Sequence, residues 1–207
     1  MEYIQNKLVN QPKKKGSTVK QDKKQKIVEA ASKLFAEKGY EKASIKEIAK
    51  EAGITSGLVH YYFQNKEEVL SDVVLEASHQ YTRDMQALKQ AVPEGQLAES
   101  AMQATKERVQ KHPDWYRLRY ELFAIGLRNP HFAEKVNQII DNGQSGISHL
   151  LTPMMPNAEE EDVAAVAAIL LACFDGLALQ KMLNPDFDID RAYLVLEKMA
   201  SSLQESE

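Results

Sequence analysis

The sequence predicts an all-α protein with an N-terminal three-helix domain and a larger C-terminal helical domain, about nine helices in total. Three observations lead to this prediction. Apolar residues recur three and four positions apart, helix-capping residues precede several such segments, and no convincing apolar–polar alternation predicts a β-strand. We expect the domains at residues 21–66 and 67–207, after a polar segment at residues 1–20.

The composition is that of a soluble globular protein. Cys173 is the single cysteine among 207 residues, so no disulfide can form within the chain, and we expect a cytoplasmic protein. No C-x-x-C or H-E-x-x-H motif predicts a metal site, and we expect no cofactor. No signal peptide or membrane span is expected, because no uninterrupted apolar run approaches the roughly 18 residues that a span requires.

An enzyme is not expected either. The five histidines are scattered without repeated spacing, and no Ser-His-Asp or glycine-loop signature occurs. Cys173 lies in an apolar run, which is typical of a buried, inert thiol rather than a nucleophile.

Charge is distributed unevenly along the chain. Residues 1–66 carry a net charge of +7 and residues 67–207 carry −11, within a total of −4. This asymmetry predicts a polyanionic partner at the N-terminal end. Residues 1–20 are rich in lysine and lack an apolar pattern, so we expect a disordered basic tail. Such a tail is either an arm that contacts DNA phosphates or the minor groove, or an inert solvated segment.

The segments that follow predict a helix-turn-helix. Residues 22–38 have helical periodicity, and Gly39 ends that supporting helix. Ser44 and Glu47 have the spacing of a reciprocal capping box at the start of a second helix. Gly53 stands where the second helix must stop, because glycine adopts the left-handed backbone conformation at the lowest cost.

Thr55 or Ser56 opens a third helix. Val59 and Phe63, four positions apart, predict its buried side. The opposite face carries small, polar and aromatic residues, namely Ser56, Gly57, His60 and Tyr61. A helix with this exposed face is suited to the major groove of DNA, which is about 12 Å wide.

The run A-x-x-A-G-I-T-x-G-x-x-x-x-Y-F-x-x-K-E, which begins at Ala49, resembles the helix-turn-helix of the TetR/AcrR family of bacterial transcriptional regulators. The resemblance extends upstream through A-A-S-K-L-F-A-E-K-G-Y at residues 30–40. It implies that Gly57, His60 and Tyr61 lie close to base edges, and His60 stands where tyrosine is often found. The residues implied to grip phosphates are Ser44, Thr55, Ser56, Tyr62 and Lys66, and Lys46 completes the predicted DNA-binding set.

Long helices are predicted after the DNA-binding domain. Asn65 and Glu68 predict the capped start of a helix that reaches about Ala91, and the resemblance implies that this helix connects the two domains. Further helices are expected at about 96–111, at 113–127 and after Pro130. Gly143 and Gly146 lie inside the last of these, where we expect close helix packing or a kink rather than a phosphate or RNA clamp.

The most apolar segment is expected to form a helix over residues 158–183, with Asn157 and Glu160 as its cap. Because it is apolar on nearly every side, we expect a second copy of the chain to bury it. Residues 174–186 also resemble the family's penultimate helix, which pairs with the last helix at a dimer interface; residues 188–202 would form that last helix. The expected interface residues are Ala168, Leu171, Ala172, Asp175, Gly176, Leu179, Val195 and Met199.

The resemblance implies a pocket for a small-molecule effector in the C-terminal domain. The candidate lining residues are Tyr81, Met85, Trp115, Tyr116, Arg119, Tyr120, Phe123 and Phe174. Each of them is also compatible with an ordinary core or surface position, and for Arg119 the sequence favours a solvated side chain over a contact with an anionic ligand.

These features predict a ligand-responsive regulator that binds a palindromic DNA site as a homodimer. By family tendency it represses transcription and is released by an inducer, although activation stays open. The alternative is a DNA-binding adaptor of the same fold that recruits a protein partner and has no small-molecule ligand. The expected partners are double-stranded DNA, a second copy of the chain and an unknown effector, without a membrane.

Overall fold

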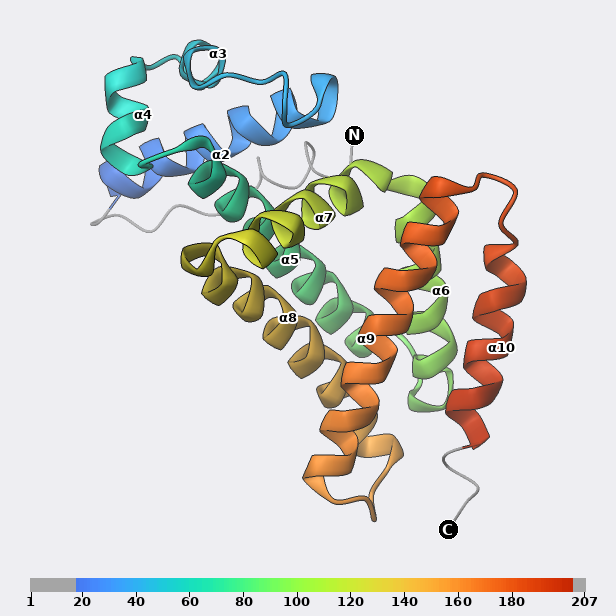
Figure 1. The fold of residues 1–207 in the computed structure, drawn as a ribbon. Coiled ribbons are helices and arrows are strands. Elements are labelled where there is room, and N and C mark those ends of the chain that lie inside the picture. The colour runs from blue at the N-terminus through green and yellow to red at the C-terminus, as the bar shows by residue number, and fades with distance from the viewer. Residues whose placement is uncertain (1–17, 203–207) are drawn as a thin grey trace. The chain divides into compact units, whose positions relative to one another are not determined.

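The computed structural model describes residues 18–202, and these residues confirm the all-α prediction (Figure 1). They contain nine α-helices and no β-strand. The helices are α2 (Thr18–Lys38), α3 (Ile45–Glu51), α4 (Ser56–Tyr62), α5 (Lys66–Ala91), α6 (Leu97–Lys111), α7 (Pro113–Arg128), α8 (Pro130–Leu151), α9 (Glu160–Leu183) and α10 (Ile189–Ser202). Two short 3₁₀ turns, η1 (Glu94–Gln96) and η2 (Thr152–Met154), lie between helices.

The helices pack as two compact units. Of the described residues, 18–77 and 117–136 form the first unit, and 78–116 and 137–202 form the second. These units divide inside α5, α7 and α8, and the domain boundary expected after residue 66 stays a prediction. The start of α5 belongs to the first unit because its apolar side is buried there, at Val69, Leu70, Val73 and Val74.

The first unit begins earlier than the periodicity predicted. Helix α2 starts at Thr18, four residues before the expected position, and ends before Gly39, whose φ of +83° is left-handed. The rest of the predicted basic tail, residues 1–17, lies outside the described residues. Phe35 of α2 packs edge-on against Tyr40 in the following loop, with ring centroids 5.4 Å apart.

Two glycines allow close helix packing. A Cβ atom at Gly126 of α7 would lie 2.6 Å from Cγ2 of Val136 on α8, within the first unit. In the second unit, a Cβ atom at Gly143 would lie 3.1 Å from Leu171 on α9, which confirms the expected close packing there. A Cβ atom at Gly146 would meet nothing within 4 Å, so that glycine has no such role.

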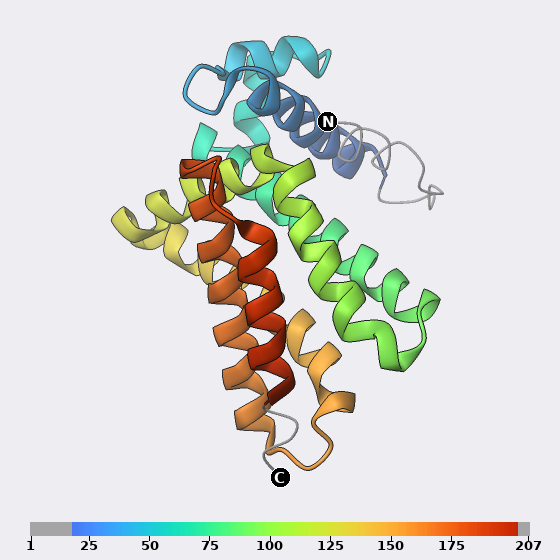
Figure 2. The same cartoon turned by 90° about the vertical axis from the view of Figure 1, so that its right-hand side faces the viewer.

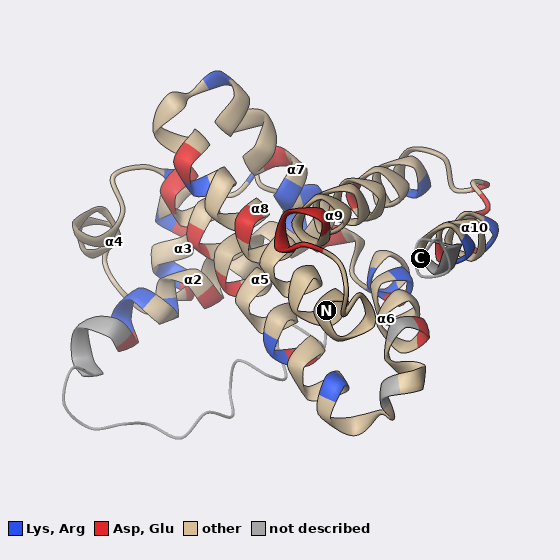
Figure 3. Cartoon of the chain, turned by 90° about the horizontal axis from the view of Figure 1, so that it is seen from below, with Lys and Arg blue, Asp and Glu red and all other residues tan. Residues whose placement is uncertain are grey.

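Helix α9 differs from the prediction at its start. It begins at Glu160 with Glu159 as the N-cap residue and no side-chain capping bond, so the cap predicted for Asn157 is wrong. The first turn contains Glu160, Glu161 and Asp162 (Figure 3), and their negative charges interact favourably with the positive N-terminal end of the helix dipole. By length and composition alone α9 is apolar enough to cross a membrane, a property that the core helix of a soluble protein can share, and 22 % of its most apolar stretch is buried.

Candidate nucleic-acid interface

The helix-turn-helix begins with the predicted capping box. The backbone N–H of Glu47 donates to Ser44 Oγ at 3.3 Å, and the backbone N–H of Ser44 donates to Glu47 Oε2 at 3.0 Å. The Lys38 ammonium also donates to the Glu47 carboxylate. Hydrogen bonds from Lys38 and Ser44 together lower the pKa of Glu47 to about 2. The start of α3 is therefore fixed by interactions within the domain.

The turn between α3 and α4 has the predicted geometry. Gly53, which follows the C-cap residue Ala52, has a left-handed φ of +67°. Thr55 is the N-cap of α4. Thr55 Oγ1 accepts the backbone N–H of Leu58 at 3.3 Å. This bond uses a lone pair of the hydroxyl, so its proton remains able to donate to a phosphate oxygen. Ile54, between Gly53 and Thr55, is half-exposed.

The two faces of α4 differ as predicted. Val59 and Phe63 are buried, at 0 % and 3 % exposure, whereas Gly57 and His60 are exposed. Tyr61 is 66 % exposed. Its ring meets the half-buried Tyr62 edge-on, with centroids 5.1 Å apart. Hydrogen-bonding side chains thus project from one side of a helix whose other side is anchored in the core.

Gly57 is not required by the fold. Its backbone lies outside the positive φ range, and an added Cβ atom would meet nothing within 4 Å. Neither strain nor internal packing explains a glycine on this exposed face. A close approach of α4 to another molecule does explain it.

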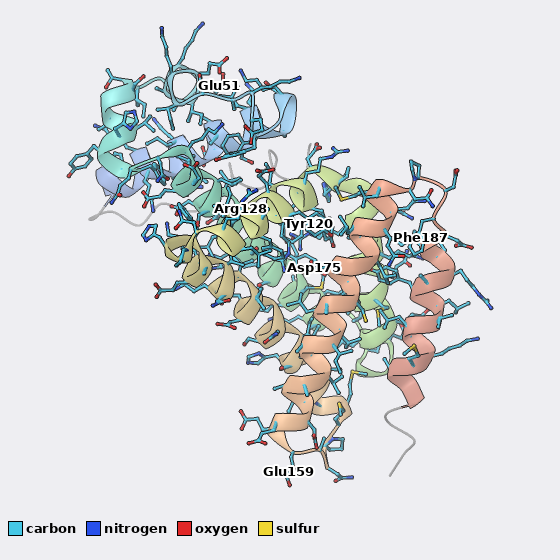
Figure 4. All side chains as sticks on the ribbon, viewed as in Figure 1. Glu51, Tyr120, Arg128, Glu159, Asp175 and Phe187 are labelled. Carbon is cyan, nitrogen blue, oxygen red and sulfur yellow. The ribbon has the colours of Figure 1, made fainter. Side chains whose placement is uncertain are left out.

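Lysines and hydroxyls of the predicted set fall into two groups. Lys46 and Thr55 are exposed and Ser56 is half-exposed. In contrast, Ser44 Oγ donates to Glu47 Oε2 at 2.7 Å, and the Lys66 ammonium donates to three backbone carbonyls. The phosphate contacts predicted for Ser44 and Lys66 stay predictions, while these bonds give both residues a structural role. Some other lysines of the first unit pair with acids, as Lys33 does with Glu51. Figure 4 labels Glu51.

In the second unit, the predicted effector residues Tyr81 and Trp115 both pack against Arg108, which was not among the predicted residues. The Arg108 guanidinium of α6 lies 3.8 Å from the ring centroid of Tyr81 and 3.5 Å from that of Trp115. The Tyr81 hydroxyl hydrogen-bonds Thr105 at 2.9 Å. Burial raises the pKa of the nearby Asp84 carboxyl, and the charge of Arg108 opposes that shift. Arg108 was missed because it lies among other charged residues of a helix without a recognisable motif.

The remaining effector candidates occupy separate places. Tyr116 is buried next to Trp115 and meets its ring edge-on, and Met85 is half-exposed. Phe174 stacks on Tyr193 of α10 at 6.0 Å. Arg119, Tyr120 and Phe123 belong to the first unit, where the rings of Tyr120 and Phe123 lie 6.5 Å apart.

Arg119 corrects the sequence reading. It is 3 % exposed, so the prediction of a solvated side chain is wrong. Its guanidinium lies over the Phe123 ring at 4.6 Å, one helical turn further along α7. The planar, weakly hydrated guanidinium stacks on an aromatic face and so tolerates burial better than a lysine would.

Helices α9 and α10 lie side by side in the second unit (Figure 2), and both carry exposed apolar side chains. On α9 these residues follow one stripe at helical spacing, formed by the exposed Ala165, Ile169, Ala172, Leu179 and Leu183 and the half-exposed Gly176. Leu194, Val195 and Met199 of α10 are also exposed. We call these nine residues the α9–α10 surface.

This surface contains five of the eight predicted interface residues. They are Ala172, Gly176, Leu179, Val195 and Met199. Leu171 instead packs toward Gly143, and Ala168 and Asp175 are half-exposed beside the stripe. On α10, Leu196 is buried while Val195 and Met199 are exposed. The predicted set lacked Ile169 and Leu183, the most exposed large apolar side chains of α9, at 62 % and 77 %.

Cys173 is half-exposed rather than buried. Residues 18–202 contain no group of three or more histidine, cysteine, aspartate or glutamate side chains placed to hold a metal ion.

Three known proteins resemble the chain over different shares of its length. The nicotine-responsive transcriptional repressor HdnoR of Paenarthrobacter nicotinovorans is 27 % identical over 79 % of this chain and 86 % of its own length. The fatty acid metabolism regulator of Bacillus subtilis is 36 % identical over 67 residues, which span 34 % of that protein. The crystal structure of FadR from Bacillus subtilis in complex with stearoyl-CoA shares the fold, with a TM-score of 0.63, 22 % identity, and coverage of 84 % of this chain and 95 % of FadR.

Two family models account for most of the chain. The model of bacterial regulatory proteins of the tetR family matches residues 27–73, which include α3 and α4. The model of the C-terminal region of BetI-type transcriptional repressors matches residues 95–205, more than half of the chain. The chain therefore belongs to the TetR family of DNA-binding transcriptional regulators, with a C-terminal region of the BetI type.

Proposed function

We propose that the protein is a ligand-responsive repressor that binds a palindromic operator as a homodimer and is released by a small-molecule inducer. The observation that supports this most is the recognition face of α4, where exposed His60 and Tyr61 lie one helical turn after Gly57, a glycine that the fold does not need. The proposed base contacts are Gly57, His60 and Tyr61. The proposed phosphate contacts are Lys46, Thr55, Ser56 and Tyr62. Ser44 and Lys66, also predicted to contact phosphates, have the structural roles described above.

The α9–α10 surface is the proposed dimer interface. It is apolar and exposed in one chain, and burying it against a second copy would remove that surface from water. Asp175 and Lys181 also lie on α9, which suits a protein partner better than a bilayer. A two-fold dimer places one α4 helix per subunit on the DNA, so the operator should be an inverted repeat. A protein of this kind works in the cytoplasm.

The effector is proposed to act in the helices that follow the DNA-binding domain. One relative is named as nicotine-responsive, and FadR was crystallised with stearoyl-CoA. These two compounds differ greatly in size, charge and polarity, so neither is assigned to this chain, but both support a small-molecule effector. An inducer can release DNA only by the difference between its affinities for the two conformations, and a coupling of about 1–3 kcal/mol lowers operator occupancy markedly. Nicotine and stearoyl-CoA are suitable first probes in a thermal-shift screen.

A second candidate function is a DNA-binding adaptor that recruits another protein. The exposed α9–α10 surface favours it, because the same apolar residues suit a different chain. Oligomeric state separates the two functions. A repressor dimer has twice the mass of one chain in detergent-free buffer without any added protein, whereas an adaptor whose surface awaits a partner stays monomeric.

The test of DNA recognition is selection from random duplexes. The purified full chain is incubated with the pool at physiological salt, and the retained DNA is sequenced over several rounds. The repressor function predicts enrichment of one inverted repeat. Binding that is sensitive to salt but blind to sequence would contradict it, because the lysine-rich end alone produces such binding.

A further inference from the structure

One side chain joins the two ends of the helix-turn-helix. The Lys66 ammonium donates to the carbonyl of Tyr40 at 3.0 Å, of Glu41 at 3.3 Å and of Ala43 at 3.2 Å. The three carbonyls belong to the loop that precedes α3, whereas Lys66 is the first residue of α5. An ammonium has three N–H donors, so the carbonyls account for all of them.

The ring of Tyr40 completes this site. The Lys66 ammonium lies 4.2 Å from its centroid, where the negative face of the ring attracts a cation. Tyr40 is 8 % exposed and is held against Phe35 of α2. Burial and the carboxylates of Glu67, Glu41 and Glu121 raise the pKa of the Tyr40 phenol. The phenol therefore stays neutral at physiological pH, and its position is set by residues of α2 and α5.

We propose that Lys66 is a positioning residue that fastens the start of α5 to the α2–α3 loop, and that it does not itself bind a phosphate. The bond to Tyr40 joins residues 26 positions apart and encloses α3 and α4. It therefore holds the recognition helix at a fixed orientation to α2 and to the start of α5. The effect on DNA affinity rests on the DNA-binding function proposed above, whereas the fastening role does not.

A phosphate contact by Lys66 would come at the expense of this arrangement. The ammonium would have to release at least one carbonyl, and a carbonyl that loses its partner in a partly buried site is costly. Lys46 provides the contrast, since it is exposed on α3 and belongs to the proposed phosphate contacts. The two lysines should respond differently to the same measurements.

The test uses three variants of the full chain. Lys66→Met keeps most of the aliphatic stem but removes the charge and the donors. Lys66→Arg keeps the charge, but its planar fork of donors cannot point at three converging carbonyls as an ammonium does. Lys46→Ala is the matched control, because it removes a lysine from the same domain without touching the loop. Each variant is examined by amide hydrogen exchange and by DNA affinity as a function of salt.

The expected results separate fastening from phosphate binding. Both Lys66 variants should raise amide exchange in the loop at residues 39–44 by about 10-fold or more, because local opening becomes easier. Both should weaken operator binding with the salt slope unchanged. Lys46→Ala should leave exchange unchanged and lower the salt slope by about 0.9, the value for one phosphate contact.

Other results would overturn the proposal. If Lys66→Met lowers the salt slope by about 0.9 while exchange in the loop stays at the wild-type rate, Lys66 is a phosphate contact. Wild-type exchange in Lys66→Arg would likewise show that charge alone suffices. If Lys66→Met does not fold, Lys66→Arg supplies the same comparison. A wild-type chain without sequence-specific DNA binding would remove the proposed repressor function, and the exchange data would still decide whether Lys66 fastens the loop.

Discussion

The helix-turn-helix and the α9–α10 surface are completed in opposite ways. In the helix-turn-helix, the polar groups at the start of α3 form hydrogen bonds and an ion pair within the chain, through Ser44, Glu47 and Lys38. On α9, large apolar side chains such as Ile169 and Leu183 remain exposed. The helix-turn-helix therefore has its internal hydrogen bonds satisfied and presents other hydrogen-bonding groups to the solvent. The α9–α10 surface exposes apolar side chains to water, and covering it with another surface would be energetically favourable.

This difference indicates how the two regions depend on each other in the proposed repressor. The DNA-binding domain of one chain presents a single helix to one half-site, which gives few contacts. Dimerisation through the α9–α10 surface brings in the DNA-binding domain of a second chain. Two linked DNA-binding sites bind with a much higher effective affinity than either alone. Sequence recognition would then lie in α4 and affinity largely in α9 and α10.

The largest effect is expected from a charge placed in the proposed interface. Replacing Ile169 and Leu179 with glutamate should convert the dimer into a monomer and weaken operator binding by about 100-fold or more, because it buries charges without partners and removes bivalent binding. Light scattering and DNA titration measure the two effects. Leu127→Glu is the control, since Leu127 is 90 % exposed but belongs to the first unit rather than to the unit that carries this surface. An unchanged dimer mass in the double variant would show that the interface lies elsewhere.

The recognition face should give a smaller, sequence-dependent effect. His60→Ala should weaken binding to the selected operator by about 1–3 kcal/mol and leave binding to random duplexes nearly unchanged. Base substitutions scanned across the half-site should show that the loss is confined to one or two positions. Equal losses on operator and random DNA would instead assign His60 to the phosphate backbone.

Features set by residues close together in the sequence could be predicted, whereas contacts between distant residues could not. The Ser44–Glu47 box, the Gly53 turn and the buried Val59 depend on residues three or four positions apart, so the sequence revealed them. The pairing of Lys66 with the loop before α3 spans 26 positions, and no local pattern encodes it. Arg119 looked solvated because its burial depends on tertiary packing, and Asn157 had a capping pattern that the chain does not use.

Packing in the first unit should be sensitive at one glycine. Gly126→Ala should destabilise the protein by about 1–3 kcal/mol, because the new methyl group overlaps the stiff side chain of Val136. Gly146→Ala is the matched control in another helix interior, where nothing lies within 4 Å. It should stabilise the protein by up to about 1 kcal/mol through helix propensity. Urea denaturation measures both, and equal stability of the two variants would contradict the close contact.

The smallest effect concerns pH. The pKa of Glu47 is lowered from 4.5 to about 2, so the stabilisation it brings is complete above pH 4.5 and disappears as the pH falls through about 2. Wild-type protein should therefore lose more thermal stability between pH 6 and pH 3 than Glu47→Gln does. Differential scanning calorimetry at both pH values measures the difference. A parallel decline in the two proteins would mean that the bonds of Glu47 to Lys38 and Ser44 contribute no net stability.

The most direct test of the account compares the selected inverted repeat with a duplex that carries one half-site. Titration and native mass spectrometry give the affinity and the number of chains bound in each case. We expect two chains on the inverted repeat and binding at least about 100-fold tighter than on the half-site. Equal affinities, with chains binding the half-sites independently, would contradict the claim that the α9–α10 surface joins two recognition helices into one DNA-binding protein.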